Sequence, residues 1–269
     1  NAIDKAEGGV VLLGSNFASK KELTLKNSVT LKSRVKHGAV FNKTVNIDTI
    51  GVVIEDVRFV AGDGHSIIID KIDNIKIEGC EFDAKNRFMT EPHINAIQLV
   101  NKCSNITIDN CSFRNGYYVT INGYADNLTV QNCTIENCKS GINLQGGENL
   151  RVINTDISVI AKGVDNDTYC VRFASSSDSS GNNLTVSGGK YKVDKNGLVA
   201  DETKAFHSAI IIRSGASGDL KASGLHIIGE VVNLSNTELD AKGNKWGIAG
   251  QTMPEEGQLK GNTKKIIVE

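Results

Sequence analysis

The sequence predicts an all-β solenoid, and three observations lead to that prediction. A nine-residue pattern occurs seven times along the chain, at intervals of 22 to 36 residues. Within each copy apolar residues alternate with polar ones, as they do in a strand with one buried face. The sixth residue of each copy is Asn, Asp or Gly, the types that tolerate the left-handed backbone of a sharp bend. Short strands repeated in this way predict a parallel β-helix.

The clearest copies, residues 105–113, 127–135 and 149–157, follow one another at a spacing of 22 residues. The other copies span residues 51–59, 74–82, 183–191 and 219–227. In each copy the second and fourth residues face inward, the sixth forms a corner, and the seventh and ninth face inward again. Equivalent residues should therefore stack inside the coil, in a file of Phe59, Phe82, Phe113, Ile135 and Ile157. An antiparallel sandwich is the alternative, but hairpins do not repeat residue identity at constant spacing.

A solenoid needs its open end covered, because an exposed strand edge recruits other chains. The sequence of residues 1–9 predicts a short helix ended by glycine, and that of residues 10–13 predicts a strand. We expect residues 1–16 to form this cap and residues 17–269 to form the β-helix, as one domain.

Composition limits the classes of partner. The formal net charge is −1 and the pI is about 6.6, whereas a nucleic-acid-binding protein would carry a basic stripe. No apolar run approaches the roughly 18 residues of a membrane span. The chain shows neither a signal peptide nor an initiator Met, so we interpret it as a mature or excised domain.

Among the six cysteines, Cys80, Cys111 and Cys133 fall on one buried repeat position, where free Cys packs as a small hydrophobe. We expect neither a metal nor a cofactor.

Three segments carry a resemblance to a known family. Residues 9–14 (GVVLLG) and 22–32 (ELTLKNSVTLK) resemble the opening of bacterial secreted proteins with the pectin-lyase-like right-handed β-helix. Residues 239–247 (LDAKGNKWG) resemble a closing segment common in those surface proteins, whose Asn-x-Trp-Gly core is matched by Asn244, Trp246 and Gly247. The resemblance implies a right-handed coil, a secreted or cell-surface location and carbohydrate as the ligand class. It implies no specific reaction.

Insertions into the repeat predict a groove, because long loops on a solenoid tend to carry function. Loops 83–95, 158–169 and 192–208 follow the third strand of a turn, and loops 175–182 and 214–218 precede the Asn-led strand. Both classes flank one sheet. Its expected outward residues are Gln98, Thr120, Asn143, Arg172 and Ile211, followed by Asn122, Gln145 and Arg213. The expected wall residues are Glu91, His93, Asp165, Asp167, Tyr169, Lys204 and His207. Any solvent-facing strand carries polar residues too, so a binding groove and an ordinary solvated face both remain open.

Three functions can be compared with these residues. Glycoside hydrolysis needs two carboxyl groups roughly 5–9.5 Å apart, and the floor has none between Gln98 and Arg213. A metal-independent polysaccharide lyase acting on a uronate glycan could use Arg172 to neutralise the uronate and Lys204 or His207 as base. A binding or structural role requires only the groove, and we favour it.

We expect a monomer that binds a polysaccharide or cell-surface glycan. The expected ligand-binding residues are Glu91, His93, Gln98, Asn122, Asn143, Asp167, Arg172 and Arg213. Arg172 should matter most because a guanidinium can bind a carboxylate or paired hydroxyls bidentately. Its replacement by Ala is expected to weaken binding by about 1.5–3 kcal/mol and to leave thermal stability nearly unchanged. The competing interpretation makes Arg172 an ordinary exposed strand residue with a loop carboxylate, Asp165 or Asp167, as its partner.

Overall fold

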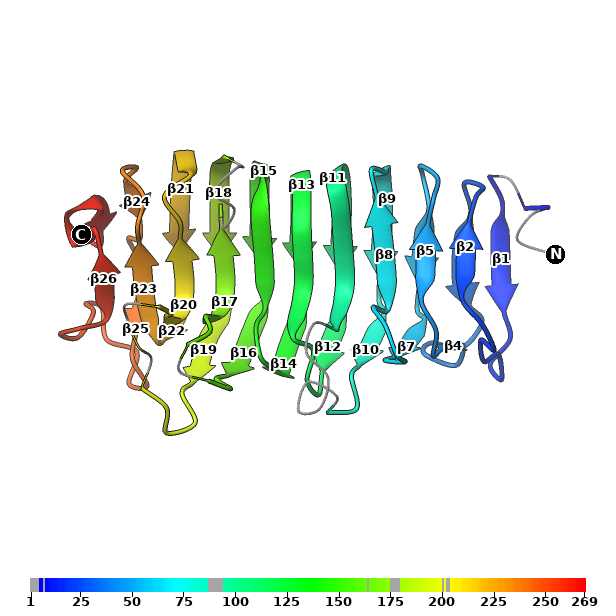
Figure 1. The fold of residues 1–269 in the computed structure, drawn as a ribbon, viewed down its shortest axis with the longest axis horizontal. Coiled ribbons are helices and arrows are strands. Elements are labelled where there is room, and N and C mark those ends of the chain that lie inside the picture. The colour runs from blue at the N-terminus through cyan, green and yellow to red at the C-terminus, as the bar shows by residue number, and fades with distance from the viewer. Residues whose placement is uncertain are drawn as a thin grey trace.

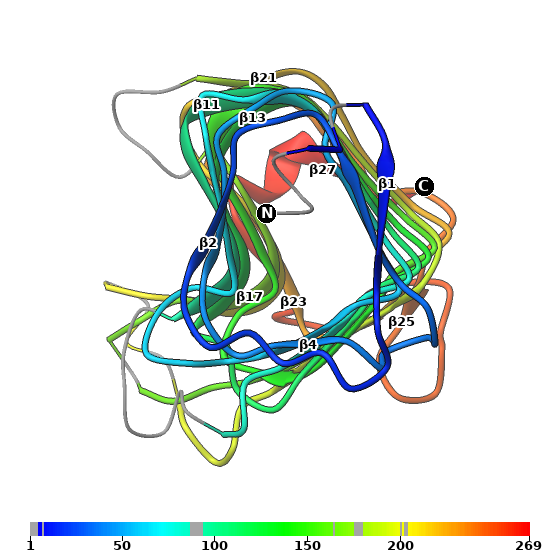
Figure 2. The same ribbon diagram turned by 90° about the vertical axis from the view of Figure 1, so that its right-hand side faces the viewer.

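The computed structural model describes residues 5–6, 8–86, 94–163, 165–174, 180–199, 201 and 204–269. Its strands pair in parallel and stack as rungs along one axis, from β1 (Val10–Leu13) at the N-terminal end to β26 (Leu259–Gly261) at the other (Figure 1). Viewed along that axis, the rungs superimpose on one another as a single coil (Figure 2). The predicted parallel β-helix is confirmed.

The strands form three strips that run the length of the solenoid. The floor strip, which carries the candidate site, consists of β2 (Leu23–Leu25), β5 (Val45–Ile47), β8 (Ile67–Asp70), β11 (Asn95–Asp109), β13 (Val119–Gln131), β15 (Ile142–Ile153), β17 (Thr168–Phe173), β20 (His207–Ile212), β23 (Glu230–Asn233) and β26. The second strip consists of β1, β3 (Thr30–Ser33), β6 (Val53–Glu55), β9 (Asp73–Glu78), the later halves of β11, β13 and β15, then β18 (Gly181–Ser187), β21 (Ala216–Ser223), β24 (Leu239–Asp240) and β27 (Ile266–Ile267).

The third strip is a separate nine-stranded sheet. It consists of β4 (Val40–Phe41), β7 (Arg58–Val60), β10 (Glu81–Asp83), β12 (Ser112–Arg114), β14 (Thr134–Cys138), β16 (Asp156–Ile160), β19 (Lys190–Asp194), β22 (His226–Ile228) and β25 (Lys245–Trp246). The floor and second strips belong to one sheet, because β11, β13 and β15 run unbroken through the corner between them. A short 3-10 helix, η2 (Thr263–Lys265), precedes β27.

A ladder of aromatic rings fills the core beneath the third strip. Phe59, Phe82 and Phe113 are aligned by register and stack with centroid distances of 4.7 and 4.6 Å. Ile135 and Ile157 continue the file as predicted, and all five side chains are at most 1% exposed. Stacking identical residues at each rung lets the interior pack without gaps, which is how a solenoid gains most of its stability.

The predicted corners also form. Asn110, Asn132 and Asn154 have φ values of 51°, 53° and 48°, in the left-handed region. A second series of left-handed residues, which the pattern did not predict, begins the second strip. These are Asn105, Asn127, Asn149 and Asn183. The side-chain amides of Asn127, Asn149 and Asn183 each donate a hydrogen bond to the Asn of this series one rung earlier, at 2.9–3.0 Å. In these four copies the leading Asn therefore makes both the bend and a ladder of side-chain amides.

The cysteines behave as small core residues. Cys80, Cys111 and Cys133 are free and at most 2% exposed. The backbone N–H of Cys111 donates to Sγ of Cys133 at 3.4 Å, which places the two in one interior file. A hydrogen bond with Cys111 and burial raise the pKa of Cys133, so its thiol stays protonated.

The N-terminal helix expected over residues 1–9 is not seen. Lys5, Ala6, Gly8 and Gly9 are not helical, and residues 1–4 and 7 lie outside the described residues. The N–H of Gly8 donates to the carbonyl of Ser28 at 2.7 Å, one rung away. The expectation of a helix was wrong because the Gly8 N–H bonds to the adjacent rung and is therefore not available for a hydrogen bond within a helical turn. In the described part of the chain, no helix is long and apolar enough to cross a membrane.

Candidate functional site

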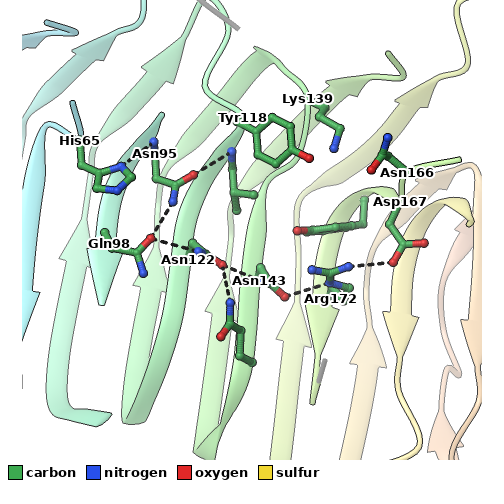
Figure 3. A pocket seen from close by; sticks show the side chains of 13 residues that line it. His65, Asn95, Gln98, Tyr118, Asn122, Lys139, Asn143, Asn166, Asp167 and Arg172 are labelled. Carbon is green, nitrogen blue, oxygen red and sulfur yellow. Dashed lines mark hydrogen bonds and ion pairs between the residues drawn. The ribbon is translucent and has the colours of Figure 1, made fainter. Parts of the chain in front are cut away.

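A file of polar side chains lies along the outside of the floor strip. The register of β11, β13, β15 and β17 pairs Gln98 with Asn122, Asn122 with Asn143, and Asn143 with Arg172. Parallel strands in register place these side chains one rung apart, close enough for direct hydrogen bonds. The prediction placed Gln98, Asn143 and Arg172 in one outward file and Asn122 at a second outward position, and the structure brings all four together (Figure 3).

The file is a continuous hydrogen-bonded ladder. Nδ2 of Asn122 donates to Oε1 of Gln98 at 3.0 Å, and Nδ2 of Asn143 donates to Oδ1 of Asn122 at 2.7 Å. Nε of Arg172 donates to Oδ1 of Asn143 at 2.9 Å. At the other end, Nδ2 of Asn95 donates to Oε1 of Gln98 at 2.6 Å. Each amide is therefore held in one orientation before any ligand arrives.

Two residues expected on the floor are not available there. Thr120 is fully buried and donates to the carbonyl of Ser140 at 3.1 Å, because Asn122, two residues later, is the residue that pairs with Gln98. Ile211 pairs with Arg172 as expected, but it is fully buried in an outer apolar cluster with Tyr169 and Val232. The polar floor consequently ends at Arg172.

The ladder forms the base of a cleft of about 460 Å³. The described residues that line it are His65, Asn95, Gln98, Tyr118, Val119, Asn122, Lys139, Asn143, Gln145, Asn166, Asp167, Tyr169 and Arg172. Its wall comes from residues that precede the floor strands, namely His65 before β8, Tyr118 before β13 and Lys139 before β15. Of the predicted wall loops, 158–169 contributes Asn166, Asp167 and Tyr169, so this insertion borders the site as expected.

The guanidinium of Arg172 already has a carboxylate partner. Its Nη1 donates to Oδ2 of Asp167 at 2.8 Å, and its Cζ lies 4.5 Å from the ring centroid of Tyr169. Nη2 of Arg213 donates to the same carboxylate oxygen, and the backbone N–H of Phe206 donates to Oδ1 of Asp167 at 2.9 Å. The structure shows the loop carboxylate of the competing interpretation, but Arg172 is only 22% exposed and lines the cleft, so it is not an ordinary exposed strand residue. Asp167 thus ties the wall to the floor.

The charge state of Asp167 follows from these contacts. Burial raises the pKa of the Asp167 carboxyl, but the charges of Arg213 and Arg172 and the Phe206 amide outweigh it and hold that pKa below the ordinary value of 3.8. Asp167 is therefore ionised at neutral pH. Two guanidinia share one carboxylate, which leaves an excess of positive charge at this end of the cleft.

His65 lies at the opposite end of the cleft and is neutral. The backbone N–H of Asn95 donates to Nδ1 of His65 at 3.0 Å, so this nitrogen is unprotonated and the proton lies on Nε2. Burial lowers the pKa of His65 below its ordinary value of 6.5. At neutral pH the His65 ring is therefore uncharged and offers its Nε2–H as a hydrogen-bond donor.

The three residues proposed for lyase chemistry do not meet. His207 is 1% exposed, and its Nε2 lies 2.8 Å from the carbonyl of Gly163. Lys204 forms ion pairs with Asp165 and Asp201 at 3.3 and 3.2 Å, and neither Lys204 nor His207 lines the cleft with Arg172. Glu91 and His93 lie outside the described residues.

Neither Lys139 nor Tyr118 was among the predicted ligand-binding residues, although both line the cleft. The pairing of Ile121 with Ile142 places these two residues, each three positions earlier, at equivalent points of successive rungs. The Nζ of Lys139 lies 3.8 Å from the centroid of the Tyr118 ring. Aligning the two turns on Ile121 and Ile142, rather than on the Asn-led copies, would have revealed the stacked pair.

The fold and the site define a class of protein, a parallel β-helix with a preformed polar cleft on one of its sheets. The family model described as the right-handed β-helix region matches residues 37–211, and the chain belongs to that family. The match includes every lining residue of the cleft. No curated protein matches the chain.

Proposed function

We propose that this protein is a secreted or cell-surface glycan-binding protein, whose cleft on the floor strip binds a polysaccharide. The observation that carries the proposal is the ladder from Gln98 through Asn122 and Asn143 to Arg172. Amides and guanidinia are the groups that hydrogen-bond sugar hydroxyls and carboxylates.

Preorganisation supports binding over a purely structural role. The ladder fixes side chains that would otherwise lose rotamer freedom when a ligand binds, and this reduces the entropic cost of association. Gln98 and Asn122 are partly exposed in the cleft and keep hydrogen-bonding capacity beyond their contacts within the ladder. A polymer can also extend along the axis, because the file crosses several rungs.

A panel of polysaccharides in affinity gels tests this proposal. The wild type should be retarded by at least one polymer, and the double variant Asn122→Ala/Gln98→Ala should lose that retardation. A matched control is Thr129→Ala/Gln131→Ala, which removes two polar side chains from β13 on the second strip. Equal retardation of the wild type and the floor variant would refute binding at this cleft.

The same panel separates binding from cleavage. A lyase acting on a uronate polymer produces an unsaturated sugar that absorbs near 235 nm. In the described cleft, Arg172 is bound to Asp167, and Lys204 and His207 lie elsewhere. We therefore expect retardation without absorbance growth. Absorbance growth that persists in Lys204→Ala and His207→Ala would show a lyase that uses other residues.

A further inference from the structure

Lys139 is an unusual residue for a surface cleft. Only 6% of it is exposed, yet it lines the cleft and its Nζ lies over the ring of Tyr118. Figure 3 shows the ammonium between Tyr118 and Asn166, on the wall above the ladder. Within the described part of the chain, no carboxylate lies within ion-pair distance of it.

An ammonium in this position needs an explanation. Burying a charge is costly unless it is paired, and lysines that are largely buried normally have an anionic partner. The face of Tyr118 offsets only part of that cost. The neighbouring charges do not supply the rest, because Asp167 is already shared by Arg172 and Arg213. Two cations, Lys139 and Arg172, therefore line the described cleft with one carboxylate, Asp167, which Arg213 also contacts.

We propose that Lys139 is the anion-recognition residue of the cleft and binds a carboxylate or sulfate group carried by the glycan. This inference rests on the proposed function, since it assigns one charged substituent of the same ligand. The ring of Tyr118 holds the ammonium of Lys139 in place. The three N–H donors of that ammonium suit a single anionic group. The neutral amides of the ladder and His65 then contact the hydroxyls of the sugars on either side.

Matched pairs of charged and uncharged polymers measure how much the anionic group contributes to binding. Dextran sulfate is compared with dextran, and polygalacturonate with its fully methyl-esterified form, so that the members of a pair share one sugar backbone and only one of them carries the anionic group. The variants are Lys139→Met, which keeps a long unbranched side chain and removes the charge, and Lys139→Arg, which keeps the charge. Lys192→Met is the control, because it removes an exposed lysine from the third strip and changes the net charge equally. Thermal denaturation confirms that each variant folds.

The wild type should bind the anionic member of one pair more tightly, and that pair identifies sulfate or carboxylate as the group. Lys139→Met should bind it about 10- to 100-fold more weakly, the loss expected for a hydrogen bond to a charged group. Binding of the neutral member should not change, and Lys139→Arg and Lys192→Met should retain the preference. At a net charge of −1, general attraction of acidic polymers is weak.

The two proposals fail in different ways. If the wild type binds a polymer but prefers the anionic member of neither pair, or if Lys139→Met keeps the anionic preference, the role of Lys139 is refuted while glycan binding stands. If the wild type binds no polymer of the panel, both proposals are refuted.

Discussion

Replacing Arg172 by Ala removes the residue that joins the floor of the cleft to its wall. The variant loses the hydrogen bond from Nε to Asn143 and the ion pair from Nη1 to Asp167. It also loses the contact between the guanidinium and the ring of Tyr169. The sequence led us to expect that Arg172→Ala would leave thermal stability nearly unchanged, but these contacts predict a measurable loss of stability.

The size of the loss in stability depends on how far the Arg172 side chain is buried and on which contacts Asp167 keeps. A hydrogen bond to a charged group contributes about 1.5–3 kcal/mol. The Arg172 side chain is 22% exposed, and Asp167 keeps its contacts with Arg213 and Phe206, so the ion pair is partly screened and partly replaced. We therefore expect a loss of about 1–2 kcal/mol in the free energy of unfolding. For a chain of this size that loss lowers the Tm by about 2–8 °C.

Calorimetry of a double-mutant cycle measures this coupling directly. The cycle comprises the wild type, Arg172→Ala, Asp167→Ala and the double variant. Arg151→Ala, an exposed arginine on β15, should stay within about 0.5 kcal/mol of the wild type. A Tm of Arg172→Ala within 1 °C of the wild type, together with no coupling to Asp167, would refute the reasoning.

The pH dependence gives an independent check on the same pair. The folded-state pKa of Asp167 lies below 3.8, so its ionised form is favoured by folding. That stability is fully present above the unfolded pKa and is lost as the pH falls through the folded pKa. The Tm difference between the wild type and Arg172→Ala should be constant from pH 7 to pH 5 and should narrow below about pH 4. A difference that widens in acid would contradict the ionic origin of the effect.

Two further predictions concern the core and the far end of the cleft. Phe82→Ala should cost about 3–5 kcal/mol, because its fully buried ring stacks between Phe59 and Phe113, whereas Phe82→Leu should cost less; urea denaturation measures both. His65 has a lowered pKa, so wild-type stability should fall as the pH drops below about 6.5. His65→Asn keeps an acceptor for the Asn95 amide, and a Tm falling as steeply between pH 7 and 5 as in the wild type would exclude His65 as the cause.

The sequence alone was sufficient for the coil and its interior. In a solenoid each rung contacts only its neighbours, so a residue's environment is set by the equivalent residue one repeat away. The file from Phe59 to Ile157 and the corners at Asn110, Asn132 and Asn154 could therefore be predicted by aligning the copies. The outward position of Gln98, Asn143 and Arg172 followed from alternation along the floor strands.

Only the tertiary structure decided which of these outward residues face an open cleft. Loop lengths between rungs vary, so alternation could not show that Asn122 rather than Thr120 aligns with Gln98, or that Tyr169 and Val232 bury Ile211. Nor could it pair Arg172 and Arg213 with Asp167, because a loop side chain finds its partner through the path of the insertion rather than through the repeat. Lys139 was missed for the same reason. Its burial and its contact with Tyr118 depend on how two turns stack in space, which no pattern within one copy encodes.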